Sequence, residues 1–313
     1  MLNKEVVRTP LAALRRMSSS GSNLLSSWWG SSEELERSAQ EQHDGNARQA
    51  SLLDGEGTIW WAIKNVALES AWEAFQQMTL HGDTDRWMGK SNSKIENAAE
   101  CRGALGETPL HVAVLLADRD IHSKQGRRTF EVIKILWNKY EVLRTCVYDE
   151  PLYKGENVLH IAIVRRLHRD VLALFVESAQ GRVLMETAAV GNFFCNPEGC
   201  CHYGEYALAF AACTNQRDTF EYLLAQGASL SVTTGNGNHN LLHLLVRHSV
   251  HKNHTTNKDK EEQQDQSLWC RDMYDFIQKQ MEEVSCSSST GATLYSKLDR
   301  QLDSENFTPL TLC

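Results

Sequence analysis

Three segments of the chain carry apolar residues three and four positions apart, which is the spacing of one face of an α-helix. Gly227 follows the third segment, at the place where a helix is expected to end. The pattern predicts amphipathic helices whose apolar stripes are Phe130, Ile133, Leu136 and Trp137; Val171, Leu172 and Phe175; and Phe220, Leu223 and Leu224. A fourth stripe, Trp269, Met273 and Ile277, follows the polar stretch 252–266, which we interpret as a solvated loop.

An eight-residue motif recurs ahead of these helices. It reads GETPLHVA at residues 106–113, GENVLHIA at 155–162 and GEYALAFA at 204–211. Fainter copies begin at residues 55, 238 and 306, and one interpretation of the copy at 238 is a shift by one residue. Recurrence of this kind predicts repeated helical units that stack on one another.

Each part of the motif has a physical role. Gly106 suits a tight turn because positive φ costs glycine little. Thr108 and Pro109 are typical of a helix start. The hydroxyl accepts from free N–H groups there, and the N–H that proline lacks would have no partner within the helix. Leu110 and Ala113 then lie on one face, where the alanine lets the neighbouring unit approach. The motif is the ankyrin signature, so we expect an all-α ankyrin-repeat solenoid.

The expected ankyrin-repeat domain covers residues 51–313, with repeats beginning near residues 55, 106, 155, 204, 238 and 306. Four of the five spacings between these starts exceed the plain unit of about 33 residues by a wide margin. The additional residues predict long finger loops, which often bind partners. The last of about six repeats is incomplete. We interpret residues 1–50, which are rich in Ser and charge, as a disordered tail.

The tail contains one candidate modification site. Arg15 and Arg16 precede Ser18 at the spacing that basophilic kinases accept, and a phosphate there would reverse the local charge. The alternative is an ordinary disordered segment with chance basic residues.

Composition excludes several classes of partner and location. The formal net charge of the 313 residues is −8, so no nucleic-acid partner is predicted. No apolar run is long enough to cross a bilayer. Nine cysteines without paired spacing indicate a reduced, cytosolic protein.

No catalytic residue, metal site or cofactor is predicted. His111, His160 and His243 recur with the motif, so we expect their rings to bond the adjoining turn and not to act as a general base. Residues 195–202 combine Cys195, Cys200, Cys201 and His202, which are zinc-ligand types. The last three are adjacent and do not easily face one ion, so exposed thiols in a long loop are the favoured interpretation.

Longer stretches of the sequence resemble the vanilloid subfamily of transient receptor potential channels. The resemblance spans about residues 55–313. It rests on residues 153–163 with Arg165 and Arg166, 191–194, 203–205, 211–216, 273–277 and 308–310.

The resemblance implies a subunit of a tetrameric, calcium-permeable cation channel whose ankyrin repeats act in assembly, gating and partner binding. It implies contact with other channel subunits through finger loops, with Phe193 and Phe194 as candidate contact residues. Some members bind calmodulin or polyphosphate nucleotides on the concave face. Basic residues in regions suitable for such binding are Lys64, Arg119, Arg165 and Arg166. The alternative interpretation is that these residues form a solvated charged face.

The motif at 306 reaches only the first helix of its repeat, so membrane helices and the pore would belong to a part beyond residue 313. The expected location is the cytoplasmic side of the plasma membrane within the channel, with membrane attachment only through that further part. Two alternatives stay open at this point. One is a free-standing cytoplasmic ankyrin adaptor, and the other is a short isoform that suppresses full-length subunits.

Overall fold

The computed structural model describes residues 57–80, 98–103, 105–195, 204–235, 237–255, 271–282 and 294–312, together with the single positions 55, 84 and 87. All regular elements in these ranges are helical, and no β-strand occurs among them. The prediction of an all-α protein is therefore confirmed for the part of the chain that the structure describes.

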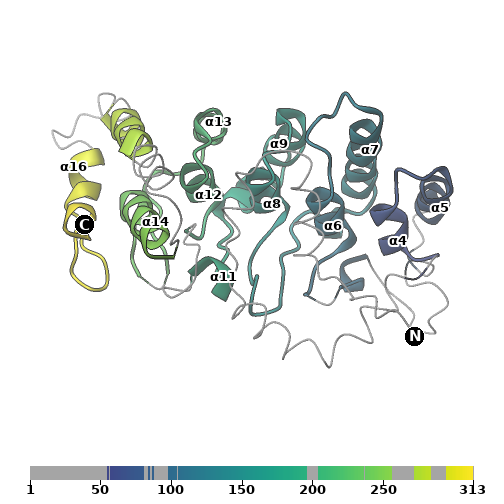
Figure 1. Cartoon of the computed structure of the whole chain (residues 1–313), viewed down its shortest axis with the longest axis horizontal. Coiled ribbons are helices and arrows are strands. Elements are labelled where there is room, and N and C mark those ends of the chain that lie inside the picture. The colour runs from purple at the N-terminus through teal and green to yellow at the C-terminus, as the bar shows by residue number, and fades with distance from the viewer. Residues whose placement is uncertain are drawn as a thin grey trace.

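Short helices form one row of the molecule. Each contacts the next along the chain, so that α4 contacts α6, α6 contacts α8, α8 contacts α12 and α12 contacts α14. Figure 1 shows this row running through the middle of the molecule from the purple end to the yellow end. The row consists of α4 (Ile59–Lys64), α6 (Pro109–Leu115), α8 (Val158–Val164), α12 (Ala207–Cys213) and α14 (Leu241–Thr255).

A second row of helices covers the first. Each of its members packs against the inner helix that precedes it, and in Figure 1 they lie above the inner row. The outer helices are α5 (Glu69–Leu80), α7 (Lys124–Lys139), α9 (Arg169–Val176) and α13 (Arg217–Ala225). The remaining helical segments are η1 (Ala98–Glu100), η2 (Glu141–Leu143), α10 (Gly181–Glu186), α11 (Asn192–Cys195), residues 271–282, α16 (Leu294–Asp299) and η3 (Pro309–Leu312).

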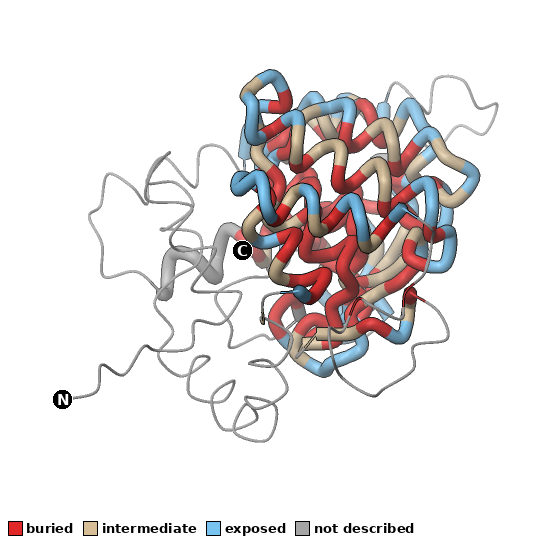
Figure 2. The backbone as a smooth tube through the Cα atoms, turned by 90° about the vertical axis from the view of Figure 1, so that its right-hand side faces the viewer, coloured by how far each residue is buried: buried red, intermediate tan, exposed pale blue. Residues whose placement is uncertain are grey.

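Burial explains why the two rows differ in sequence. All seven residues of α12 are buried, because this helix lies between two inner neighbours and its own outer helix. A helix surrounded in this way is apolar on every side. The outer helices bury one stripe only, and the predicted Ile133, Leu136 and Trp137 of α7 are buried while Phe130 is half-buried. Figure 2 looks along the rows and shows the buried residues gathered between them.

The motif begins α6 and α8 in the way that the sequence predicts, whereas Tyr206 begins α12 without a side-chain cap. Thr108 Oγ1 accepts from the His111 N–H, and Asn157 Oδ1 accepts from the N–H groups of Leu159 and His160. Gly106 and Gly155 have φ values of 80° and 85°. The end of α13 is also as predicted, because Gly227 has φ of 93° and donates to the Leu224 carbonyl.

The interpretation of the copy at 238 as shifted is wrong. Asn238 occupies the glycine position with φ of 50°, and Asn240, two residues later, accepts from the N–H groups of Leu242 and His243. This is the register of the copies at 106 and 155. The shifted copy is the first, where the cap is Thr58, one place later in the motif. Asparagine tolerates the left-handed conformation, so it replaces glycine without moving the helix start.

Candidate functional site

The three motif histidines belong to the scaffold. Nδ1 of His111 accepts from the Thr108 N–H at 3.1 Å, Nδ1 of His160 from Asn157 at 3.2 Å, and Nδ1 of His243 from Asn240 at 3.3 Å. The predicted bond from each ring to its own turn is therefore confirmed. A ring whose Nδ1 accepts in this way carries its proton on Nε2.

The second ring nitrogen points toward the next unit. Nε2 of His243 lies 3.1 Å from the Phe307 carbonyl oxygen. Burial lowers the pKa of His160 to about 3, against the opposing effect of the Glu205 carbonyl. Burial, together with the charge of Arg102, lowers the pKa of His111 to about 3 as well. The rings of His111 and His160 therefore stay neutral at physiological pH. His243 links its own turn to the following one.

Two loops pack backbone to backbone beside α8. We call residues 148–156 and 188–194 the loop pair. The N–H groups of Val190, Asn192 and Phe193 donate to the carbonyls of Lys154, Pro151 and Leu152 at 2.8, 3.1 and 3.0 Å, in that order. Figure 1 shows α11, which ends the second loop, below α8 and α12.

Glycine allows the loops to approach this closely. A Cβ on Gly155 would lie 2.1 Å from the Ala188 oxygen. A Cβ on Gly191 would lie 2.4 Å from the Leu152 oxygen. No side chain fits at either position without moving backbone, so the contact between the loops depends on both glycines.

An aromatic cluster lies under the loop pair. The ring of Tyr153 is 5.2 Å from that of Phe193 and 6.0 Å from that of Phe194. The Phe194 ring lies 5.3 Å from Phe210 of α12, which in turn lies 4.6 Å from His160. Ring separations in this range are favourable. The cluster joins both loops to two inner helices.

Phe193 and Phe194, the candidate contact residues, are only 8% and 2% exposed. Their rings face the interior of this chain. That the loop contacts another subunit stays a prediction, but the part of the loop that is available to a partner is the backbone and side chains above these rings.

A second concentration of charge lies at the turns that end α6 and α8. Arg119 Nε donates to the Arg165 carbonyl at 2.8 Å, and Arg166 Nη2 donates to the Thr214 carbonyl at 2.5 Å. In the opposite direction, Gln216 Nε2 donates to the Ile163 carbonyl at 2.7 Å. Cations are stabilised by the free carbonyls at helix C-termini. Each turn thus binds the helix end of its neighbour.

The alternative of a solvated face is wrong for Arg165, which is 8% exposed, whereas Arg119 is half-buried and Arg166 is exposed. Burial and the charge of Arg119 lower the pKa of Arg165 to about 10. Nε of Arg165 and Nη2 of Arg119 are buried without a hydrogen-bond partner among the described residues. Buried donors of this kind are uncommon, and they mark a place where an anion would be stabilised.

The other candidate residues divide into two groups. Lys64 is the exposed last residue of α4. Ser18 lies outside the described residues, as do Cys200, Cys201 and His202, and the side chain of Cys195 is also outside them. In the described ranges, no group of three His, Cys, Asp or Glu side chains has the arrangement of a metal site.

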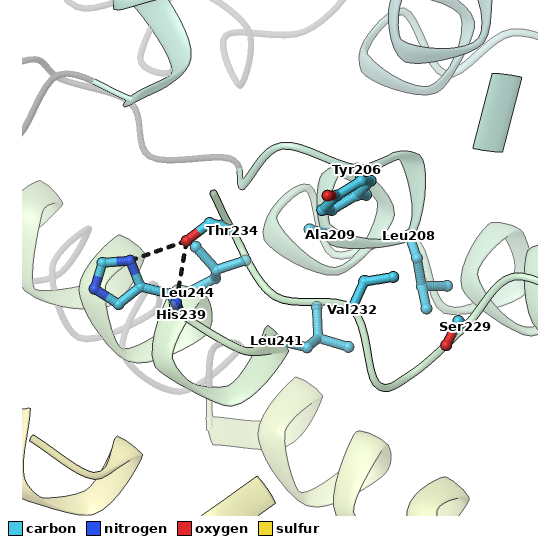
Figure 3. A pocket seen from close by; sticks show the side chains of 9 residues that line it. All are labelled: Tyr206, Leu208, Ala209, Ser229, Val232, Thr234, His239, Leu241 and Leu244. Atoms are coloured by element: carbon cyan, nitrogen blue, oxygen red, sulfur yellow. Dashed lines mark hydrogen bonds between the residues drawn. The ribbon is translucent and has the colours of Figure 1, made fainter. Parts of the chain in front are cut away.

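A small apolar pocket lies between α12 and α14. Figure 3 shows Thr234 at its edge, where Oγ1 accepts from the His239 N–H at 3.0 Å. The lining residues are Tyr206, Leu208, Ala209, Ser229, Val232, Thr234, His239, Leu241 and Leu244. The pocket was not predicted from the sequence, because its walls come from three separate segments.

The fold and these contacts define an all-α protein of paired helices with long loops between the pairs. Over about half its length, the chain is homologous to subfamily V of the transient receptor potential cation channels. It is 42% identical to subfamily V member 2 from Homo sapiens over 169 residues, which are 51% of this chain and 20% of that protein. It is 38% identical over 104 residues to member 1 from Canis lupus familiaris, covering 32% of this chain and 12% of that protein.

Member 5 from Rattus norvegicus is 32% identical over 145 residues, 46% of this chain and 18% of that protein. The chain therefore spans about one fifth or less of the length of these curated relatives. No protein-family model matches it. None of the helices described is long and apolar enough to span a bilayer. The homology is to ion channels, which are not enzymes, in agreement with the prediction that the motif histidines are not catalytic.

Proposed function

We propose that this chain is the cytosolic ankyrin-repeat region of a calcium-permeable, vanilloid-type channel subunit. Its role is subunit assembly and the regulation of gating. Homology to subfamily V channels over about half the chain supports the proposal. So does the recurrence of one cap, one positive-φ turn and one inner helix at residues 106–115, 155–164 and 238–255, with each inner helix in contact with the next. We assign these units, with those near 55, 204 and 306, to six repeats.

Assembly is tested by co-expression with a full-length subunit. Tagged human subfamily V member 2 is expressed with the untagged chain, captured in mild detergent and probed for the chain. The expected result is co-capture that excess untagged chain competes away. A chain with the inner helices α6 and α8 disrupted, by Leu110→Asp and Leu159→Asp, serves as an unfolded control. Absence of capture above this control would contradict the assembly role and favour a free-standing adaptor.

The same cells distinguish assembly from suppression. Calcium entry through the full-length channel is recorded with and without the chain. A reduced current together with capture indicates a suppressor isoform. Capture without a change in current indicates assembly alone.

We further propose that the turns that follow α6 and α8, which carry Arg119 and Arg165, bind a polyphosphate nucleotide. The proposal rests on the buried N–H groups of these two arginines that have no hydrogen-bond partner in the part of the chain that the structure describes. Titration calorimetry with ATP is expected to show binding that salt weakens. Arg165→Gln should weaken binding at least tenfold. Arg182→Gln, at an exposed arginine of α10, is the matched control. Equal affinities for the two variants would contradict the site.

Calmodulin binding is a separate proposal that follows from the homology alone. Capture of the chain on immobilised calmodulin, with calcium and then with chelator, tests it. Retention that requires calcium is the expected result, and retention in chelator or none at all would contradict it.

A further inference from the structure

Two histidines of neighbouring helix pairs meet at the turns that follow α6 and α8. His122 lies just ahead of α7, and His168 is the N-cap residue of α9. Their ring centroids are 5.7 Å apart, and the ring planes meet at 78°. The inner helices α6 and α8 pack against each other, and Figure 1 shows the two helix pairs side by side. The histidine contact therefore joins one helix pair to the next.

The separation of the two rings matches what one shared metal ion requires. A zinc ion lies about 2.0–2.1 Å from an imidazole nitrogen, which places it about 3.2 Å from the ring centroid. Two imidazoles on one tetrahedral ion then have centroids about 5.2 Å apart. The observed distance of 5.7 Å exceeds this value by about half an ångström. Small rotations of the side chains would therefore bring both rings onto one ion.

Each ring can present a nitrogen to such an ion. The ring of His122, an exposed residue, has no hydrogen-bond partner in the part of the chain that the structure describes, where only its backbone is bonded. The side chain of His168 is 38% exposed. Its Nδ1 accepts from the Asp170 N–H at 3.2 Å and lies 3.6 Å from Asp170 Oδ1. With a metal on Nε2, the proton would lie on Nδ1 and face this carboxylate, which is the usual arrangement behind a ligating histidine.

The turn that carries His122 already has a fixed shape. Asp118 Oδ1 accepts from the Asp120 N–H at 3.0 Å, and Asp120 Oδ1 accepts from the His122 N–H at 2.9 Å. The exposed carboxylates of Asp120 and Asp170 each lie two residues from a histidine, so negative charge flanks both rings. A nearby cation, Arg127, donates to the His122 carbonyl and so binds the backbone side of this residue. The charges around the two rings therefore tolerate a divalent cation.

We propose that His122 and His168 form a zinc-binding site that bridges the α6–α7 pair and the α8–α9 pair. Imidazole is a ligand that suits zinc, as it does copper and nickel. Two nitrogens fill two of the four positions of a tetrahedral ion and leave the others to water, so the site is open and its zinc exchanges. It differs from a site with three protein ligands, of which the described ranges contain none. Bound zinc fixes the two turns to each other, and this inference does not depend on the proposed channel role.

Titration calorimetry with zinc chloride tests the site in the full chain. Accessible thiols are alkylated first, because cysteine thiolates also bind zinc. His122→Asn and His168→Asn should each weaken binding by about tenfold or more, and the double variant should bind no more weakly than either single one, because one imidazole alone does not chelate. Asparagine at position 168 keeps the cap of α9, since it is a favoured N-cap residue. Lys124→Ala, at the exposed first residue of α7, is the matched control and should leave the affinity unchanged.

Nuclear magnetic resonance identifies the ligands directly. On addition of zinc, the ring protons of His122 and His168 should shift together, and each single variant should abolish the shift of the remaining ring. Circular dichroism at 222 nm without zinc shows that the variants are folded. A shift of only one ring would overturn the bridge. Equal zinc affinities of the alkylated chain with and without the two histidines would overturn the site and show that the pair is only a packing contact.

Discussion

Asn157 performs two tasks that a pair of substitutions can separate. Its Oδ1 accepts from the N–H groups of Leu159 and His160 at 2.9 and 3.1 Å, which caps α8. Its Nδ2 donates to the Leu184 carbonyl at 2.9 Å. Leu184 lies in the last turn of α10, so that carbonyl has no partner further along the helix. The side chain is fully buried.

The expected cost of Asn157→Ala follows from these contacts. Loss of an N-cap costs about 1 kcal/mol. A buried carbonyl left without a donor costs about 1–3 kcal/mol. The free energy of unfolding should therefore fall by about 2–4 kcal/mol. Asn157→Thr keeps a cap, because Thr108 performs that task at the same motif position. It should lose only the Leu184 bond and cost about 1–3 kcal/mol.

Urea denaturation followed by circular dichroism at 222 nm measures both variants against the unaltered chain. A loss below about 0.5 kcal/mol for Asn157→Ala would refute the reasoning. So would an equal loss for the two variants, because the threonine would then provide no cap.

Three further predictions use the same assay. Gly155→Ala should lower the free energy of unfolding by at least about 1 kcal/mol more than Gly227→Ala does. Both glycines have positive φ, but only at Gly155 would the new Cβ meet backbone, at 2.1 Å from the Ala188 oxygen. Equal losses for the two variants would contradict this reasoning. The lowered pKa of His160, about 3, means that its contribution to stability is complete above about pH 6.5 and is lost as the pH falls toward 3. His160→Gln should therefore make unfolding free energy less dependent on pH in that window, and an unchanged slope would show that the ring is not responsible. Tyr222→Phe should cost about 0.5–1.5 kcal/mol because it removes the 2.9 Å bond to Glu177, and no loss would show that this bond contributes nothing.

The inner helices, their caps and the outer stripes could be predicted from the sequence because each depends on residues close together in the chain. The register of the copy at 238 differs from the sequence prediction for a reason that is equally local. Its turn uses Asn238 where the copies at 106 and 155 use glycine, and both residue types adopt the left-handed conformation.

The roles of Phe193 and Arg165 could not be predicted locally. The resemblance implies a subunit contact at Phe193 and Phe194, yet both side chains are buried, and their loop donates three backbone hydrogen bonds to a loop more than thirty residues away. The sequence alone suggests that Arg165 is a surface charge, but the neighbouring turn, which carries Arg119, packs beside it and Arg165 is buried. In both cases, the residues that decide burial lie in another unit.

This division follows from how the units are joined. Asn157 reaches Leu184, His243 reaches Phe307 and Arg166 reaches Thr214, so each side chain leaves its own helix and satisfies a carbonyl of a later segment. A stacked array owes much of its stability to such nearest-neighbour interfaces. Substitutions at these positions should therefore uncouple adjacent helix pairs and broaden the unfolding transition. Substitutions inside one outer helix should shift the midpoint of the transition and leave the width of the transition unchanged.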